Sequence, residues 1–451
     1  MRSDVEYFLR DKHILSSPVI HHSGSCQYLE NHTGRRDPVT PECCKTSNGV
    51  ELRDSLKKAA IEAVDAVKER LFSISDQMYR EPEVGLQEWK SSKLLVDLLK
   101  EFGFEVEVGL CNLPTSFRAI RRGKPGGPTV AILAEYDALP EIGHGCGHNI
   151  IGTAAAGAGI ALAPLMDNIR GTLVVLGTPA EEGAVDNAGG KVTLLEGGAF
   201  SGVDVAMMFH PSQKDVVMST SNARVAMEIS FRGKAAHAAG APHEGINALD
   251  AAILTFNAWN ALRQHVKEDV RIHGIITKGG VSPNIIPDYA EIRMYVRAKD
   301  MDYLRQVEDK VKKCAEGAAT ATGATVNFRY TAKAYANMIT NETLARAFGK
   351  NLEALGRKVQ EPEPKAGGGS TDMGNVSHVV PSIHPYIAIC EPGTATSHSR
   401  EFAKATISEM GHKGLLDGAK ALAMTAIDVF TDPVLLAAIK DEFAKKVSRK
   451  G

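Results

Sequence analysis

The segment 143–149 reads GHGCGHN and places His144, Cys146 and His148 two residues apart, with a glycine in each gap. Side chains two residues apart point in the same direction where the backbone is extended, whereas on a helix they diverge. Glycine favours loop conformations and lets the backbone approach a buried centre closely. Cysteine with histidine suits a borderline-soft ion such as zinc, and histidine with carboxylate also admits manganese or cobalt. The spacing therefore predicts a loop that holds a divalent metal ion.

Other residues of metal-binding type follow later apolar segments. Glu181 and Glu182 come after the run GTLVVLG, His210 ends VDVAMMFH, and His398 follows HPYIAI. Open α/β sheets bind ligands beyond the carboxyl ends of their strands, where these residues are expected. Adjacent residues of an extended chain point apart, so one glutamate of the pair can bind metal while the other moves protons. His144 taken alone is more simply a histidine that hydrogen-bonds within its loop.

These segments together resemble the co-catalytic metallopeptidase and aminoacylase family (clan MH). The branch with a cysteine ligand has a signature of the form Asp-Ala-Leu-Pro followed by His-Ala-Cys-Gly-His-Asp, and this chain reads EYDALPEIGHGCGHN. The resemblance covers nearly everything from residue 50 onward and is nearest to aminobenzoyl-glutamate hydrolases and aminoacylase-like dipeptidases. Two positions depart from the family pattern. Asn149 stands where many relatives have aspartate, and Glu135 stands where the carboxypeptidases have a metal-binding histidine.

The resemblance implies one or two divalent metal ions as cofactors, zinc first, with manganese or cobalt as alternatives. By the same resemblance, Cys146 bridges two ions, Glu182 and His210 complete one side, and His398 completes the other. The implied metal ligands are Cys146, His148, Glu182, His210 and His398. Glu181 corresponds to the general base, and Asp137 to the aspartate that orients a ligand or the base.

Residues of the middle section also correspond to functional positions of the family. His237, in FRGKAAHAAG, corresponds to a histidine that reaches the partner subunit's active site and stabilises the oxyanion. Asn284 and Arg297 correspond to residues near the substrate carboxylate, although Arg297 is equally well explained as a structural ion-pair partner. The later stretch AGGGSTDMG offers consecutive backbone N–H groups, including those of Gly368 and Gly369, that suit a carboxylate. It lacks the Gly-Lys-Ser/Thr ending of a phosphate loop.

The elements that must position these residues are predicted from periodicity. Apolar runs alternate with helical stretches from Val50 onward, which predicts an α/β fold with a mixed, mostly parallel sheet and flanking helices. Residues 221–333 read strand-helix-strand-strand-helix-strand, the ferredoxin-like order, and are expected to form an inserted lid and dimerisation domain. The catalytic domain then comprises residues 49–220 and 334–451, and residues 1–48 are expected to form a poorly ordered tail.

Composition narrows the class of protein. The chain has 451 residues, of which 43% are hydrophobic and 24% charged, with a formal net charge of −2. The near-neutral balance argues against nucleic-acid or membrane-surface partners, and no apolar run long enough to span a bilayer is expected. Seven scattered cysteines do not resemble a disulfide framework, which favours a cytoplasmic location. The partners expected are a small amide or dipeptide substrate with a free carboxylate, and a second copy of the chain, bound through the inserted domain.

Two other functions fit parts of the pattern. A cysteine hydrolase would use Cys146 as its nucleophile, but it leaves the glutamate pair and the later histidines without a role. Sensitivity to chelators separates it from a metallohydrolase. A non-catalytic binding protein of the same fold would keep a structural metal, but it has no use for a base at Glu181. A nucleotide-binding oxidoreductase is disfavoured because no G-x-G-x-x-G follows a strand.

Overall fold

The computed structural model of the chain describes residues 28–30, 36–38, 41–362 and 368–448. It divides into residues 1–52 and residues 53–451. In the first part, strands β1 (Tyr28–Glu30) and β2 (Arg36–Pro38) pair antiparallel. Helix α2 (Pro41–Ala66) begins at Pro41 rather than at the predicted Val50. The expected tail over residues 1–48 otherwise falls mostly outside the described residues.

The main sheet has six strands in the order β13-β7-β5-β6-β4-β3. The four strands β13, β7, β5 and β6 run parallel, and β4 and β3 add an antiparallel edge. Their bounds are β3 Glu105–Val108, β4 Phe117–Arg122, β5 Lys124–Ala134, β6 Arg170–Gly177, β7 Val205–Met207 and β13 Ser382–Ile383. The central strands are apolar on both faces because helices cover both faces. The predicted mixed, mostly parallel sheet with flanking helices is confirmed.

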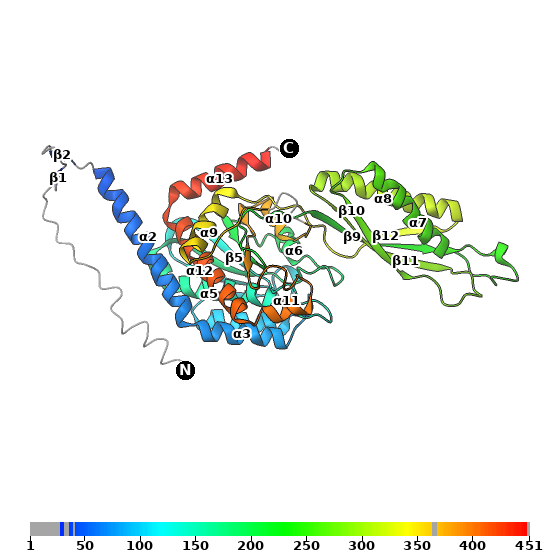
Figure 1. Ribbon diagram of the computed structural model, residues 1–451, viewed down its shortest axis with the longest axis horizontal. Helices are drawn as coiled ribbons and strands as arrows, with labels where there is room; N and C mark the ends of the chain where they lie inside the picture. The colour runs from blue at the N-terminus through cyan, green and yellow to red at the C-terminus, as the bar shows by residue number, and fades with distance from the viewer. Residues whose placement is uncertain (1–27, 31–35, 39–40, 363–367, 449–451) are drawn as a thin grey trace. The chain divides into compact units, whose positions relative to one another are not determined.

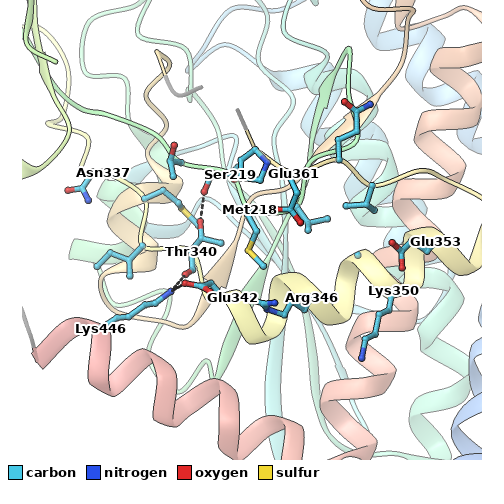
Figure 2. Close-up of a pocket in the computed structure, with 18 residues that line it drawn as sticks. Met218, Ser219, Asn337, Thr340, Glu342, Arg346, Lys350, Glu353, Glu361 and Lys446 are labelled. Carbon is cyan, nitrogen blue, oxygen red and sulfur yellow. Dashed lines mark hydrogen bonds and ion pairs between the residues drawn. The ribbon is translucent and has the colours of Figure 1, made fainter. Parts of the chain in front are cut away.

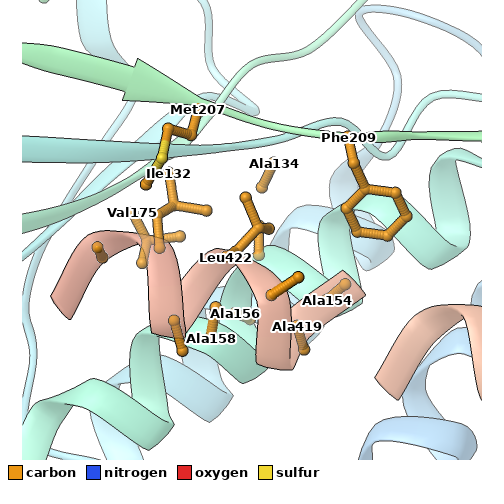
Figure 3. Close-up of a cluster of buried hydrophobic side chains, with 14 of the residues drawn as sticks. Ile132, Ala134, Ala154, Ala156, Ala158, Val175, Met207, Phe209, Ala419 and Leu422 are labelled. Carbon is orange, nitrogen blue, oxygen red and sulfur yellow. The ribbon is translucent and has the colours of Figure 1, made fainter. Parts of the chain in front are cut away.

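Helices α5 (His148–Leu162) and α12 (Glu409–Thr431) pack against each other beneath this sheet. Figure 3 shows Leu422 of α12 near the strand residue Ile132, with the labelled alanines of α5 and Ala419 of α12 in the same apolar cluster. The small residues of α5 allow this close approach, since a Cβ added to Gly157 would lie 3.4 Å from Cβ of Ala419 in α12, and one added to Gly159 would lie 2.6 Å from a methyl of Val175 in β6. The other helices of this region are α3 Lys68–Arg80, α4 Trp89–Glu101, α6 Gly190–Glu196, α9 Glu342–Ala354, α10 Met373–Ser377, α11 Arg400–Ala405 and α13 Pro433–Ser448.

One helical stretch, His148–Asn168, is long and apolar enough to cross a membrane by length and composition, contrary to the expectation from the sequence. A second stretch qualifies only if α12 and α13, which meet at a bend of 98°, are counted as one span. The first stretch is 89% buried inside the protein. Its apolar composition is therefore explained by its place in the core, where its alanines and glycines contact neighbouring helices.

A second, four-stranded sheet is formed between residues 223 and 330. Its strands run antiparallel in the order β10-β11-β9-β12, and helices α7 and α8 cover one face (Figure 1). In chain order these elements are β9 Ala223–Arg232, α7 Ala248–Leu262, β10 Arg271–Lys278, β11 Tyr289–Ala298, α8 Met301–Thr322 and β12 Thr325–Tyr330. The order is β-α-β-β-α-β, as the periodicity predicts. Trp259 of α7 is fully buried in this layer's own core.

A short parallel pair, β8 (His210–Ser212) and β14 (Tyr386–Ala388), extends the carboxyl edge of the main sheet. The backbone of His210 is tied to this edge, because its N–H donates to the carbonyl of Pro385 at 2.8 Å. The pair therefore places His210 beside the loops that follow β5 and β6.

Candidate metal centre and active site

The GHGCGHN segment forms a loop that ends where helix α5 begins at His148. Gly147 caps the helix with φ of +81°, a conformation that favours glycine. A Cβ at Gly147 would lie 2.7 Å from the ring of Pro211, so glycine also allows the loop to approach strand β8. This contact brings Cys146 next to His210.

The five predicted metal ligands come together, and Cys146 lies at their centre. Its Sγ is 3.3 Å from His210 Nε2 and 3.5 Å from His398 Nε2. Ligand atoms of Cys146, His148 and His210 form one compact group, and those of Cys146, Glu182 and His398 form another. Cys146 Sγ thus belongs to both groups, which is the position that a bridging ligand would need. Glu182, however, groups with His398 rather than with His210. The loop that carries His398 returns across the loop after β5, where the backbone N–H of His398 donates to the carbonyl of Gly145 at 2.7 Å.

Neighbouring groups fix the orientation of these side chains. Asp137 binds His148 Nδ1 through one oxygen at 2.8 Å and accepts the Glu182 N–H through the other at 2.9 Å. His210 Nδ1 lies 2.7 Å from the carbonyl of Pro211, to which it donates. Both imidazoles therefore present Nε2 to the group of ligands, an arrangement typical of metal-binding histidines. The position of Asp137 is that expected of the orienting aspartate.

Several buried polar atoms of the ligand groups have no hydrogen-bond partner in the described part of the chain. His148 Nε2, Glu182 Oε1 and Glu135 Oε2 have no hydrogen-bond partner among the described residues. Burial, together with the Glu182 carboxyl, raises the pKa of the Cys146 thiol well above its usual range, and burial also raises the pKa of Glu182. A divalent cation would satisfy the open atoms and favour the ionised thiol and carboxyl. The donor set of one thiol, three imidazoles and a carboxylate fits such an ion.

Glu135, the residue that replaces a metal-binding histidine of the carboxypeptidases, is paired with a lysine. Lys191 Nζ lies 2.5 Å from Glu135 Oε1 and 2.5 Å from Asp372 Oδ1, and all three side chains are buried. Burial by itself raises the pKa of Glu135, but the Lys191 ammonium and the nearby histidines together outweigh burial and lower that pKa to about 2. The second oxygen of Glu135 lies 3.4 Å from His148 Nε2. Glu135 thus stays next to the metal ligands as a carboxylate balanced by Lys191.

Glu181, the predicted base, is 9% exposed and lines the cavity beside the ligands, with one carboxylate oxygen 4.0 Å from His148 Nε2. Burial, Glu135 and Glu182 raise its pKa well above the usual range. Its backbone is held on both sides. Tyr335 Oη donates to its carbonyl at 2.6 Å, and the preceding Ala180 has φ of +55° with its N–H bonded to Glu88 at 2.8 Å. Carboxylate oxygens of Glu181 and Glu182 lie within 4.8 Å of each other and of a ring nitrogen of His148, so both glutamates reach the ligand group.

A cavity of about 510 Å³ opens over these residues. Strand β11 contributes Arg297, whose guanidinium donates to Gly368 O and to Ser370 Oγ, each at 3.2 Å. Gly369 also lines the cavity, and Gly368 is exposed beside it. The first two residues of the predicted AGGGSTDMG stretch lie outside the described residues. The structure therefore brings Arg297 and this loop to the same cavity as the metal ligands.

His237 and Asn284 lie elsewhere in the same chain. Both are exposed, and the loops that carry them are joined by a hydrogen bond from Ala238 N to Asn284 O at 3.0 Å. Neither lines the cavity of about 510 Å³. His144 is buried and accepts the Asn149 N–H at 3.2 Å, which agrees with a hydrogen-bonding role. The amide of Asn149 donates to Ser75 and Thr406, away from the metal ligands.

A larger cavity of about 870 Å³ lies beside helices α9 and α13 (Figure 2). It shares no residue with the cavity over the ligands. Three of its charged side chains pair with one another, since Glu342 binds both Arg346 at 3.2 Å and Lys446 at 2.9 Å. Size alone therefore does not identify the site, and the chemistry lies in the smaller cavity.

Several residues of the site escape prediction from the sequence. Lys191 lies in a glycine-rich stretch, and buried His384, which lines the cavity, lies inside an apolar run. Asp372 belongs to the predicted loop AGGGSTDMG, where the pattern points to the backbone rather than to a carboxylate. Glu88 and Arg224 occur in segments that show only the pattern of a helix start and of a strand. In the sequence, the signal that could have indicated these residues is a charged or polar residue within an otherwise apolar segment.

Comparison with known proteins agrees with this geometry. The family model for peptidase family M20/M25/M40 matches residues 131–426. The chain is 40% identical to the mouse (Mus musculus) Xaa-Arg dipeptidase over 90% of this chain and 96% of that protein. It is 31% identical to a p-aminobenzoyl-glutamate hydrolase polypeptide of Escherichia coli over 84% of this chain and 93% of that protein.

Solved structures share the fold. A dinuclear metal-binding M20 peptidase from Bacillus subtilis superimposes with a TM-score of 0.60 at 22% identity, covering 81% of this chain and 99% of its own. An aminobenzoyl-glutamate utilization protein from Klebsiella pneumoniae gives 0.66 at 18% identity, with coverage of 81% and 97%. The match to the family model spans more than half of the chain, and the curated relatives span nearly all of it. The chain therefore belongs to peptidase family M20/M25/M40 and is a hydrolase of that family.

Proposed function

We propose that this protein is a metal-dependent amidohydrolase that cleaves the amide bond of small N-acyl or aminoacyl compounds bearing a free carboxylate. The observation that carries the proposal is the pair of ligand groups that share Cys146, with Glu181 beside them at the wall of one cavity. The names of the mouse and Escherichia coli relatives support amide substrates of this kind.

The metal-binding role falls to Cys146, His148, Glu182, His210 and His398. When bound, divalent ions supply Lewis acidity toward a carbonyl oxygen and toward water. Zinc is the first choice for this donor set, with manganese or cobalt as alternatives. The remaining steps belong to side chains of the protein.

Glu181 is the proposed general base. Its carboxylate faces the cavity, takes a proton from the attacking water and passes it to the leaving amide nitrogen. Asp137 holds His148 and the Glu182 backbone in place, so the base and the ligands keep a fixed relation. In the same cavity, Arg297 is the proposed partner of the substrate's free carboxylate.

We also propose a homodimer formed through the layer of β9–β12. Strand β10 is an edge strand and exposes Ile275 and Ile276, at 65% and 38%, which is an unusual feature for an uncovered edge. Helix α7 exposes Ile253 and Leu254, at 45% and 40%, and these, rather than its buried Trp259, are available to a partner.

The dimer would bring His237 of one subunit to the metal site of the other, together with Asn284. His237 Nδ1 accepts the N–H groups of Ala239 and Gly240, at 3.3 and 3.0 Å, so its proton resides on Nε2. Nε2 is then a hydrogen-bond donor on an exposed side chain. It is suited to stabilise the oxyanion that forms when the amide is attacked.

The direct test is a panel of N-acyl amino acids, dipeptides and aminobenzoyl-glutamate, assayed after chelation and after reloading with zinc, manganese or cobalt. Elemental analysis accompanies each sample. We expect no turnover in the metal-free protein and recovery on reloading. Full activity in a sample verified as metal-free would contradict the proposal and favour Cys146 as a nucleophile.

A further inference from the structure

Two arginines face each other across strands β9 and β11 at the wall of the active-site cavity. Arg224 and Arg297 are direct partners in the antiparallel register, so their side chains lie on the same face of the sheet. The backbone N–H and C=O of Arg224 both bond to Tyr335. Arg224 therefore exchanges no backbone hydrogen bonds with Arg297. In such non-hydrogen-bonded pairs of an antiparallel sheet, the two Cα atoms are only about 4.5 Å apart. Both side chains line the cavity that holds the metal ligands.

Arg224 is a buried cation that forms no ion pair with any of the described residues. It is 3% exposed, and its Nε and Nη2 have no hydrogen-bond partner among the described residues. Its guanidinium packs against aromatic faces, with its carbon 3.9 Å from the centre of the Tyr335 ring and 5.0 Å from that of Tyr295. A buried charge with no ionic partner is unfavourable unless an anion joins it. The side chain is thus prepared for a negative group that enters from the cavity.

Arg297 does not relieve this imbalance. Its contacts are the neutral oxygens of Gly368 and Ser370, and it adds a like charge directly opposite Arg224, which is unfavourable in a sheet. Burial and the proximity of Arg224 lower the pKa of Arg297. Two adjacent guanidinium groups with donors to spare can bind two carboxylates, each by paired N–H···O bonds.

We propose that Arg224 and Arg297 form a paired anion subsite that selects substrates with an acidic residue, glutamate or aspartate, at the free-carboxylate end. The inference rests on the proposed function, in which Arg297 takes the terminal carboxylate, and it assigns the side-chain carboxylate to Arg224. A terminal arginine would place a third guanidinium at the same wall. The specificity therefore differs from that named for the mouse relative.

The test compares glycyl-glutamate, glycyl-glycine and glycyl-arginine as substrates of the metal-loaded protein. In the wild type, kcat/KM for the glutamate dipeptide is expected to exceed that for the arginine dipeptide by about tenfold or more. Arg224→Gln is expected to lower kcat/KM for the glutamate dipeptide by about tenfold and for glycyl-glycine by less than about threefold. Arg224→Lys keeps the charge and is expected to retain part of the preference. Arg232→Gln, which removes an exposed arginine of the same strand, is the matched control and should match the wild type.

Calorimetric binding of free glutamate, glycine and arginine gives a second readout that does not depend on turnover. Glutamate is expected to bind the wild type most tightly and to lose that advantage in Arg224→Gln. The subsite is refuted if the wild type favours arginine, or if Arg224→Gln weakens all three ligands equally. If the wild type cleaves none of the amides, the proposed function fails, and glutamate binding still decides the subsite. If Arg224→Gln does not fold by circular dichroism, the wild-type preference and Arg224→Lys decide it.

Discussion

Replacing Lys191 with methionine tests how the site tolerates buried carboxylates. Lys191 is the cation between Glu135 and Asp372, at 2.5 Å from each, and none of the three side chains is exposed. Methionine fills similar volume but leaves two carboxyl groups without their partner. Removing one member of a buried ion pair typically costs about 3–5 kcal/mol.

The pKa of Glu135 gives a second measure of the same interaction. That pKa is lowered from 4.5 to about 2 in the folded protein, and Lys191 is its main attractive partner. The difference corresponds to about 3 kcal/mol of stability at neutral pH. Asp372, whose pKa is raised by burial, contributes in the opposite direction. A loss of about 3 kcal/mol lowers a urea midpoint by about 1 M when the slope is about 3 kcal/mol per molar.

The assay is urea unfolding of the metal-stripped wild type and of metal-stripped Lys191→Met, with the unfolded fraction measured by circular dichroism. Lys93→Met is the matched control. Lys93 lies 2.6 Å from Asp97, but the two side chains are 73% and 56% exposed, so its removal should cost less than about 1 kcal/mol. Adding Glu135→Gln to Lys191→Met is expected to recover part of the loss, because one stranded charge is removed.

The pH dependence follows from the direction of the shift. A lowered carboxyl pKa contributes stability that is fully present above about pH 4.5 and is lost as the pH falls toward 2. The gap between wild type and Lys191→Met should be widest at neutral pH and above, and it should narrow as the pH falls. The two buried carboxyls left without Lys191 take up protons at a raised pKa, and the wild type loses the Glu135 contribution below about pH 4.5. If Lys191→Met loses no more stability than Lys93→Met, the buried pair does not contribute as reasoned.

Three further predictions concern the chemistry. Glu181→Gln should lower kcat by about 10²–10⁴-fold with metal content unchanged, whereas Glu182→Gln should lose metal; elemental analysis with the opposite result would reverse the two roles. Cys146→Ala should lose at least one ion per chain, because the thiol is shared by both ligand groups, and Cys390→Ala, which removes another buried cysteine, should keep its metal content. Glu181→Gln and His237→Ala, each inactive, should regain about a quarter of wild-type activity when co-refolded, because half of the randomly formed dimers carry one intact site. Confirmed subunit exchange without recovery would show that His237 does not act across the interface.

Local pattern alone determined much of this protein. Periodicity of the apolar residues predicts the strands and helices of the β9–β12 layer, and continuous apolar runs predict the central strands of the main sheet. Cys146, Glu181 and His210 each follow a strand. Because the carboxyl ends of parallel strands share one edge of a sheet, these residues were expected to lie close together. Residue type and spacing were enough to predict a metal site there, because few side chains bind such ions and the strands set their positions.

Only the tertiary structure decided how these residues combine. Glu182 meets His398 rather than His210 because the chain returns across the loop after β5, a contact between residues more than two hundred positions apart. Lys191 reaches Asp372 because helix α6 packs beside α10, and it also pairs with Glu135 after β5; no local period indicates either contact. Arg224 has the local pattern of any strand residue, and its significance lies in the register that sets it opposite Arg297. Spacing along the chain fixes which way neighbouring side chains point, whereas burial and charge pairing depend on which distant segments meet.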